Sequence, residues 1–143
     1  MSAVDDLVAF ARLFGLLERN AVCCGTVTVA QCVALQVLTS GSWNNASLAK
    51  ELGVTRGAVT RLLDGIEKRG WVERKRDAAD RRRFEVVLTR KGRAEAKRLR
   101  DLTDASLSMV LSKVPRGKRK SVEESIHMLR VAAEQTRAEW PIG

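Results

Sequence analysis

Residues 45–70, NASLAKELGVTRGAVTRLLDGIEKRG, decide the fold of this 143-residue chain. The stretch begins with a short predicted helix whose apolar face holds Leu48, Ala49 and Leu52. Gly53 then permits a sharp turn, because glycine has no Cβ and reaches positive φ without steric cost. A second helix is expected after it. Two helices joined by a tight glycine-containing turn indicate a helix-turn-helix.

The second predicted helix begins at Thr55 and has two unlike faces. Its apolar residues recur with the spacing i, i+3, i+4 and i+7: Val59, Leu62, Leu63 and Ile66. The opposite face carries mainly hydrogen-bonding and cationic residues: Arg56, Gly57, Thr60, Arg61, Asp64 and Lys68. We therefore expect this helix to rest on a core and to present its polar face to a partner.

A β-hairpin is predicted after Gly70, a residue type that commonly ends helices. Trp71–Arg76 and Arg83–Leu88 read as its strands, and apolar residues alternate with other residues in the second strand. The segment between them, DAADRR, is polar and basic. A helix-turn-helix followed by a basic hairpin is a winged helix. The predicted fold class is mainly α with a small β-hairpin wing (α+β).

Residues 48–96, LAKELGVTRGAVTRLLDGIEKRGWVERKRDAADRRRFEVVLTRKGRAEA, closely resemble the core of MarR-type transcriptional regulators. The resemblance is specific in the helix-turn-helix, in the D-x-R of the wing tip (Asp80 and Arg82), and in the LTxKG step of residues 88–92. It covers about residues 28–100 directly. It implies a dimeric, sequence-specific DNA-binding regulator, expected to be a repressor that an effector releases from DNA.

The flanking helices fit this family by their order and length. A first helical stripe is expected at Leu7, Phe10, Ala11, Phe14 and Leu17, and this helix is predicted to end near residues 20–25. Thr28 and Thr89 are expected to cap two later helices, the second running to about Ser112. A last helix is predicted over Lys118–Trp140, with a heptad-like seam at Val122, Ile126, Leu129, Ala133, Thr136 and Trp140.

The resemblance also implies the domain organisation. We expect one MarR-like domain over residues 1–143, with the winged helix in residues 28–90. Residues 1–22 and 91–143 are expected to form the helical dimerisation part, which interlocks two subunits into a homodimer. In this family a short strand near Trp43 often joins the sheet of the wing.

The charge of the chain points to an anionic partner. The formal net charge is +9 at pH 7. Residues 56–98 hold 15 Lys and Arg against 7 Asp and Glu, so most of the surplus lies in the predicted winged helix. No apolar run approaches the ~18 residues of a membrane span, and the first residues are acidic where a signal peptide is basic. We therefore expect a cytoplasmic protein with no membrane partner.

Double-stranded DNA with a pseudo-palindromic operator is the expected partner. Arg56, Thr60 and Arg61 are the candidates for reading base edges in the major groove. Thr55 is expected to cap the helix and to contact phosphate. Arg74, Lys75 and Arg76 would support phosphate binding.

The wing is expected to reach the minor groove with Arg81, Arg82 and Arg83, because that groove attracts arginine. By resemblance, Arg82 is the tip residue and Asp80 orients it through a salt bridge.

Three cysteines, Cys23, Cys24 and Cys32, fall within ten residues. We place the first two at the end of the first helix and the third about one turn into the second helix. Three thiolates suit trivalent arsenic or antimony, Hg(II), or zinc with a fourth ligand. Oxidation is an alternative, with Cys32 as one partner because a disulfide between neighbours is strained.

Two further alternatives concern the effector. Cys32 can simply fill a buried helix, as cysteine commonly does, with the other two cysteines structural. The effector is then a small aromatic molecule. No cofactor is required under any of these hypotheses.

Two rival classes of function are disfavoured. Catalysis would need a nucleophile with a base, and a cysteine with His127 is the only candidate, so the chain is predicted not to be an enzyme. A winged helix that binds protein can lose its basic recognition face, whereas this chain keeps Arg56, Arg61 and Arg82.

Overall fold

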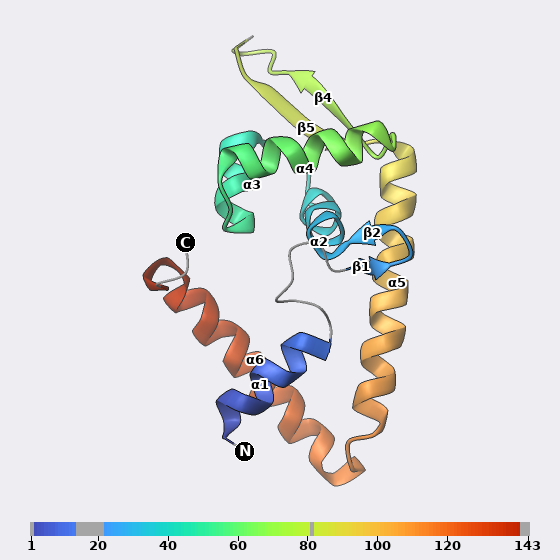
Figure 1. Cartoon of the computed structure of the whole chain (residues 1–143), viewed down its shortest axis with the longest axis vertical. Coiled ribbons are helices and arrows are strands. Elements are labelled where there is room, and N and C mark those ends of the chain that lie inside the picture. The colour runs from blue at the N-terminus through green and yellow to red at the C-terminus, as the bar shows by residue number, and fades with distance from the viewer. Residues whose placement is uncertain (1, 14–21, 81, 141–143) are drawn as a thin grey trace. The chain divides into compact units, whose positions relative to one another are not determined.

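The computed structural model describes residues 2–13, 22–80 and 82–140, with only the backbone of Val22, Cys23 and Cys24. The chain divides into two compact units, Met1–Asp101 and Leu102–Gly143 (Figure 1). The elements of the first unit are α1 (Ala3–Leu13), β1 (Val22–Cys24), β2 (Val27–Thr28), α2 (Val29–Leu38), β3 (Trp43–Asn44), α3 (Asn45–Leu52), α4 (Arg56–Lys68), β4 (Val72–Arg76) and β5 (Phe84–Leu88). Helix α5 (Arg90–Ser112) runs across the boundary, and α6 (Arg116–Thr136) and the 3₁₀ helix η1 (Arg137–Glu139) follow.

Side-chain caps fix the starts of the helices around the core. The Thr28 hydroxyl accepts from the Gln31 amide at 3.1 Å, and the Gln31 side chain accepts from the Thr28 amide at 3.1 Å. This capping box satisfies two amides that the helix itself leaves unpaired. The Thr89 hydroxyl likewise accepts from the Gly92 amide at 3.0 Å. Both predicted threonine caps are confirmed.

The helix-turn-helix forms as predicted. Asn44 caps α3, and Gly53 ends it in the left-handed region at φ 67°. Thr55 then caps α4 through a 3.1 Å hydrogen bond from the Ala58 amide. Three of the four predicted stripe residues of α4 are buried, since Val59, Leu63 and Ile66 are at most 1% exposed, and Leu62 is half-buried.

The wing is a three-stranded antiparallel sheet of order β3-β5-β4. Trp43 of β3 pairs with Val86, so the short strand expected from the family is present. Val86 and Leu88 of β5 are buried as their alternation predicts. Phe84 is 46% exposed, because at the far end of the strand it lies opposite Arg76, whose guanidinium lies 5.4 Å from the ring centroid.

The start of α5 is packed directly against the backbone at the base of the wing. A Cβ added to Gly92 would lie 1.8 Å from the Trp71 carbonyl oxygen. Only glycine allows this approach. Ala96 and Leu99, farther along α5, are buried in the core. The first half of α5 is therefore fixed to the winged helix.

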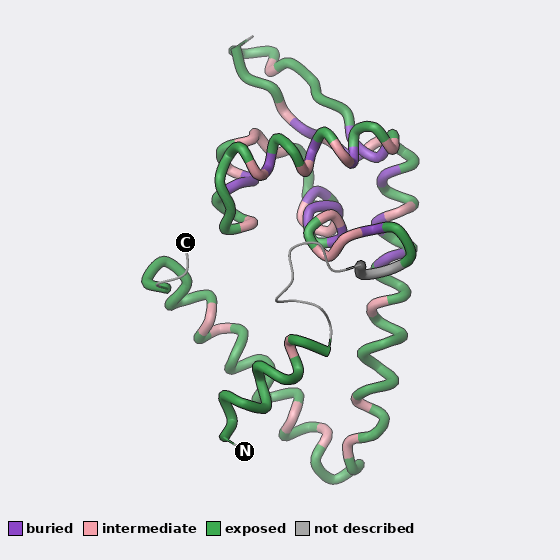
Figure 2. The backbone as a smooth tube through the Cα atoms, viewed as in Figure 1, coloured by how far each residue is buried: buried purple, intermediate pink, exposed green. Residues whose placement is uncertain are grey.

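The hydrophobic core lies within the first unit. Figure 2 shows buried positions in α2, α3 and α4, at the base of the wing, and in the first half of α5. The residues of α1 and α6, all of them described, include none that is buried. The largest fully buried side chains are Leu35, Leu48, Leu63, Ile66, Leu99, Val27 and Val59.

The chain differs from the predicted boundaries at both ends. Helix α1 is described over Ala3–Leu13, while Phe14 and Leu17 of the predicted stripe lie outside the described residues. Cys23 and Cys24 belong to strand β1 and not to a helix end. Gly25, at φ 64°, turns the backbone so that β1 pairs with β2. Helix α6 begins after Pro115, and its last predicted turn is the 3₁₀ helix η1.

Candidate nucleic-acid interface

The exposed face of α4 carries the residues predicted to read DNA bases. Burial of Val59, Leu63 and Ile66 on one side turns Arg56, Thr60 and Arg61 outward, and all three are exposed. This face holds two guanidinium groups and one hydroxyl on a helix with a fixed backbone. Such a surface is suited to insertion into the major groove.

Thr60 lies in a small hydrogen-bond network between α3 and α4. Its hydroxyl donates to the Arg56 carbonyl oxygen at 3.0 Å and accepts from the Asn45 side-chain amide at 3.0 Å. The Asn45 Oδ1 atom is buried, with no hydrogen-bond partner found among the described residues. The network ties the recognition helix to the first residue of α3.

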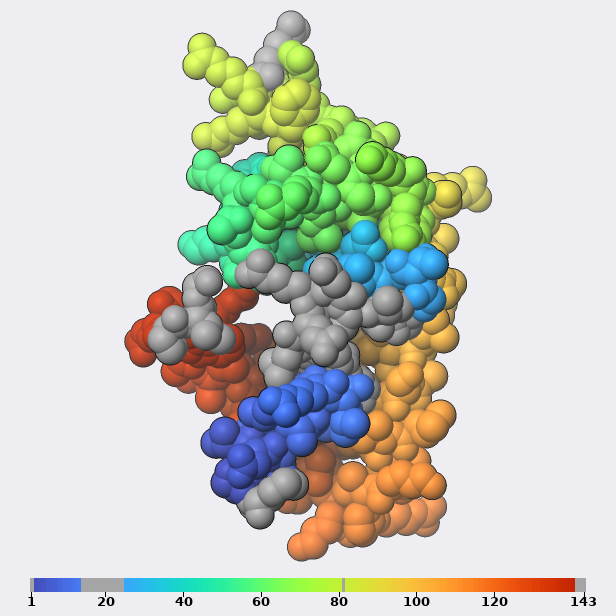
Figure 3. Space-filling view, in the orientation of Figure 1, coloured from blue at the N-terminus to red at the C-terminus, as the bar shows by residue number. Residues whose placement is uncertain are grey.

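A cavity of about 660 Å³ separates the helix-turn-helix from the wing. In the space-filling view the wing projects beyond the helix-turn-helix (Figure 3). Arginines from both parts line the cavity, together with polar and apolar residues: Arg56, Arg74, Arg82, Arg83, Asn44, Asn45, Ala46, Thr60, Leu63, Phe84 and Val86. The guanidinium groups of Arg56, Arg82 and Arg83 around this hollow favour an anionic, phosphate-bearing ligand.

The wing tip is organised by Asp80, with partners that differ from the prediction. Its Oδ1 atom accepts from the backbone amide of Arg82 at 3.0 Å, and its Oδ2 atom lies 3.7 Å from Arg83 Nε. Asp80 thus contacts Arg82 through the main chain, and its described salt bridge is with Arg83. The reason is local, because a tight turn brings the amide of residue 82 back onto the carboxylate. Arg81 lies outside the described residues.

Arg74 has a role in the structure that the sequence did not reveal. Its guanidinium contacts Asp64 at 2.6 Å and Glu67 at 3.1 Å, so it joins strand β4 to two acids of α4. Two carboxylates offset its charge, which weakens its predicted contribution to phosphate binding. Its main structural effect is to hold the wing against the recognition helix.

Comparisons with known proteins agree with this architecture. The model of the MarR family matches residues 27–84. Over 60 residues, 42% of this chain, the sequence is 38% identical to the transcriptional repressor MprA of Escherichia coli (strain K12). The structure is similar to that of the multiple antibiotic resistance repressor MarR, with a TM-score of 0.71, 25% identity, and coverage of 92% of this chain and 95% of that one. The chain matches the MarR family in sequence over residues 27–84 and in fold over most of its length.

A MarR-family fold therefore covers nearly the whole chain. A crystal structure of Streptococcus pneumoniae FabT in complex with DNA has a TM-score of 0.75 to this structure, with 21% identity and coverage of 92% and 96%. That likeness shows the fold alone. The match to MprA spans 34% of the length of that protein.

The relatives MprA and MarR are a transcriptional repressor and a multiple antibiotic resistance repressor, which agrees with the prediction that the chain is not an enzyme. Among the described helices, none has the length and apolar character needed to cross a bilayer.

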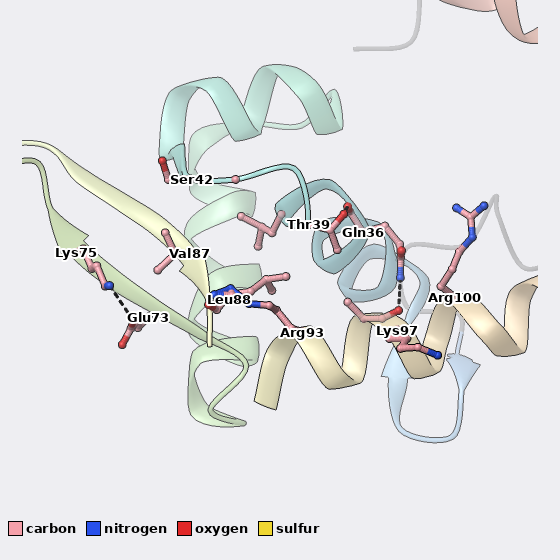
Figure 4. Close-up of a pocket in the computed structure, with 13 residues that line it drawn as sticks. Gln36, Thr39, Ser42, Glu73, Lys75, Val87, Leu88, Arg93, Lys97 and Arg100 are labelled. Atoms are coloured by element: carbon pink, nitrogen blue, oxygen red, sulfur yellow. Dashed lines mark hydrogen bonds and ion pairs between the residues drawn. The ribbon is translucent and has the colours of Figure 1, made fainter. Parts of the chain in front are cut away.

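A second cavity, of about 690 Å³, lies on the other side of the wing sheet from α4 (Figure 4). Its charged lining is mostly cationic: Lys75, Arg93, Lys97, Arg100 and one acid, Glu73. Lys75 and Glu73 form a 3.3 Å ion pair, and Gln36 donates to the Ala96 carbonyl oxygen at 2.8 Å. The cationic surplus makes this hollow suited to a small organic anion.

Arg69 links the end of α4 to the hairpin that carries two of the cysteines. It donates to the Thr26 hydroxyl at 3.0 Å and to the Thr26 carbonyl oxygen at 2.9 Å, in the turn between β1 and β2. The same guanidinium lies 4.8 Å from the ring centroid of Trp71. The pKa of Glu95 is lowered, chiefly by the hydrogen bond from Arg98 and also by the charges of Arg69 and Lys91.

Of the three cysteines in the predicted thiol site, the structure describes the side chain of Cys32 alone. Cys32 is 7% exposed in the core, which agrees with its interpretation as a buried helix residue. Only the backbone of Cys23 and Cys24 is described, so binding of a metal or metalloid by their thiols stays a prediction. Within the described part of the chain, no three potential ligands are grouped for a metal ion.

Sequence reasoning missed three contacts of this region. Asn45 to Thr60, Arg74 to Asp64, and Arg69 to Thr26 join residues 10 to 43 positions apart. Periodicity finds residues that share a helix face, but it carries no signal for side chains that meet across elements.

Proposed function

We propose that this chain is a MarR-family, sequence-specific DNA-binding transcriptional repressor. The observation that carries the proposal is the joint arrangement of the α4 face and the wing. Arg56, Arg82 and Arg83 border one cavity, with Thr60 beside them. The MprA likeness supports repression, because that relative is a transcriptional repressor. The α4 face would read base edges and the wing would contact the minor groove.

Salt dependence of DNA binding tests this proposal. The full chain is titrated against DNA from its own upstream region and against random-sequence DNA at 50 and 200 mM salt. We expect specific affinity to fall by about 10³-fold or more over this range, because six or more phosphate contacts release counterions. Binding that ignores salt, or equal affinity for both DNAs, would contradict the proposal.

We further propose that two copies of the chain form the DNA-binding unit. Apolar side chains on α1 remain exposed, with Leu13 at 84% and Leu7 at 49%. In the second unit, Ile126 is 52% exposed and Leu129 is 49% exposed. Ile126 and Leu129 belong to the heptad-like seam of α6, and such a seam is suited to packing against another helix. A homodimer would present two α4 helices to the half-sites of a pseudo-palindrome.

The mass of the particle tests self-association directly. Light scattering after size exclusion should give twice the mass of one 15.8 kDa chain. A single-chain mass at micromolar concentration would contradict the dimer. The upstream-DNA titration reports on DNA binding separately.

For the effector, we propose thiol ligation by trivalent arsenic or antimony at Cys23, Cys24 and Cys32. The backbone supports this proposal, since β1 folds back on β2, and β2 leads directly into α2, whose fourth residue is Cys32. Arsenous acid would bind three thiols, forming three As–S bonds and releasing three molecules of water. Such a ligand shifts the DNA-binding equilibrium only by its different affinity for the two states.

Arg69 connects the β1–β2 hairpin, which carries Cys23 and Cys24, to the end of α4. Its two hydrogen bonds hold the hairpin turn, and it follows directly after α4. A ligand that changes the hairpin would therefore change the support of α4. We expect R69M to keep arsenic binding while losing at least half of the arsenic-driven release from DNA.

The effector experiment compares thiol reagents on the DNA-bound protein. Wild type, C23S, C24S and C32S are titrated with trivalent arsenic, Hg(II) and peroxide. Arsenic-driven release that the serine variants lose would support the proposal. Release by peroxide alone, reversed by reductant, would indicate disulfide formation, in which two thiols lose two protons and two electrons to peroxide.

A small organic ligand is the alternative effector, and the observation that favours it is the cationic cavity of about 690 Å³ on the other side of the wing sheet. If the serine variants respond like wild type under every treatment, the cysteines are structural. Salicylate, an aromatic carboxylate, then serves as a probe. Its effect should be lost in R93A if the cavity binds it, because Arg93 lines this hollow.

A further inference from the structure

We propose that Thr60 recognises a thymine through its methyl group and that its hydroxyl takes no part as a donor in base reading. The inference deepens the proposed DNA-binding function and depends on it. It concerns the central polar residue of the exposed α4 face, where a threonine has two different ways to recognise a base. The structure favours one of them.

The hydroxyl of Thr60 is already engaged. A threonine hydroxyl has one hydrogen and two lone pairs. The hydrogen is donated to the Arg56 carbonyl oxygen, and one lone pair accepts from Asn45 Nδ2, both at 3.0 Å. Thr60 therefore has no hydrogen to offer to guanine N7 or O6, adenine N7 or thymine O4, the major-groove acceptors.

Both partners of the hydroxyl are held in place. The Arg56 carbonyl belongs to the first turn of α4, and Asn45 is the first residue of α3. Asn45 already has a buried Oδ1 atom without a hydrogen-bond partner among the described residues. Freeing the Thr60 hydroxyl would take away the bond of the Asn45 amide as well. The network therefore opposes rotation of Thr60 when DNA approaches.

Because its hydroxyl is engaged, we infer that the group Thr60 offers to a base from this exposed position is its methyl group. In the major groove only thymine carries an apolar group, the C5 methyl, among the unmodified bases. Arg56 and Arg61 on the same face provide the hydrogen-bond donors for neighbouring bases. The recognition helix thus divides the task between two arginines that donate and a threonine that makes an apolar contact.

Replacement of thymine by uracil in DNA tests the inference, since it removes only the methyl group. An operator is first selected from random DNA with the full wild-type chain, and each thymine is then changed to uracil. We expect one thymine in each half-site whose replacement weakens wild-type binding by about fourfold, the effect of losing one buried methyl group. This measurement uses wild-type protein and is independent of the folding of any variant.

Two variants assign that thymine to Thr60. T60S keeps the hydroxyl and loses the methyl, so it should bind the thymine and uracil operators equally. T60V keeps a methyl and loses the hydroxyl, so it should retain the fourfold preference. Thermal melting checks that both variants are folded, because T60V removes the acceptor of Asn45.

The outcomes separate this inference from the proposed function. Selective binding without any thymine–uracil difference, or a difference that persists in T60S, would overturn the Thr60 inference and leave the DNA-binding proposal intact. A preference retained in T60S and lost in T60V would also overturn the inference, because the contact with the thymine methyl would then not depend on the methyl group of Thr60. If no sequence is selected from random DNA, both the proposed function and this inference fail.

Discussion

Helices α4 and α6 have similar apolar stripes but opposite burial. In α4 the stripe residues Val59 and Ile66 are fully buried within the first unit. In α6 the seam residues Ile126 and Leu129 are 52% and 49% exposed. Both stripes follow a helical period, so periodicity alone does not distinguish them. The α4 stripe is covered by its own unit, whereas the described residues of the second unit leave Ile126 and Leu129 of the α6 stripe about half exposed.

This difference in burial indicates that the two regions depend on different interactions for stability. The winged helix carries a closed core, and its polar surface is left for a ligand. The second unit contributes little core of its own, so its apolar residues should act mainly through association. Substitutions in the two regions should therefore affect different measurements.

Alanine substitutions of one glycine in each region should give the largest difference in the free energy of unfolding. G92A places a Cβ 1.8 Å from the Trp71 carbonyl oxygen, so the start of α5 must move away from the wing. We expect a loss of about 3 kcal/mol or more in the free energy of unfolding, measured by urea denaturation. G117A is the matched control in α6, because no atom lies within 4 Å of its added Cβ. It should stabilise the helix by about 0.5–1 kcal/mol. Equal changes in the free energy of unfolding for G92A and G117A would contradict the expected difference between the two regions.

Leucine truncations should separate folding from association. Leu63 is 1% exposed, so L63A should lower the free energy of unfolding by about 2–5 kcal/mol through lost burial and a cavity. L129A should instead weaken self-association by about tenfold or more. Urea denaturation at fixed protein concentration and sedimentation equilibrium report the two quantities. A tightly associated L129A protein would show that the α6 seam does not form the interface.

Arginine truncation on the α4 face should reduce DNA affinity without changing the fold. We expect R61A to weaken operator binding by about 5- to 150-fold, the range for one bidentate base contact. K118A is the control, because Lys118 is an exposed cation on α6. Fluorescence anisotropy with operator and random DNA distinguishes base reading from general charge. A similar loss on both DNAs would assign Arg61 to phosphate contact.

The smallest expected effect concerns the link between the wing and α4. Arg74 contacts Asp64 and Glu67, and its side chain is 33% exposed. R74M should lower the free energy of unfolding by about 1 kcal/mol or less, since solvent screens such pairs. The loss of stability is measured as the decrease in the thermal midpoint of R74M relative to wild type at low and at high salt. A decrease that is the same at both salt concentrations would argue that packing, and not charge, is lost.

Much of the winged helix follows from local sequence signals. Thr28, Thr55 and Thr89 cap helices at the predicted positions. The signals fail where tertiary context decides. Cys23 and Cys24 lie in a strand because Gly25 turns the chain back upon β2. The Asp80 prediction transferred a salt bridge to Arg82, but the turn geometry gives that residue a backbone hydrogen bond.

The sequence by itself determined the winged helix, its polar recognition face and its basic wing, because caps, turns and periodicity act over a few residues. The tertiary structure decided which of those polar groups remain available to bind a ligand. It engages the Thr60 hydroxyl with Asn45 and offsets the charge of Arg74 with acids of α4. The physical reason is that a side chain's hydrogen-bonding capacity depends on neighbours brought near by packing, and sequence distance does not reveal them.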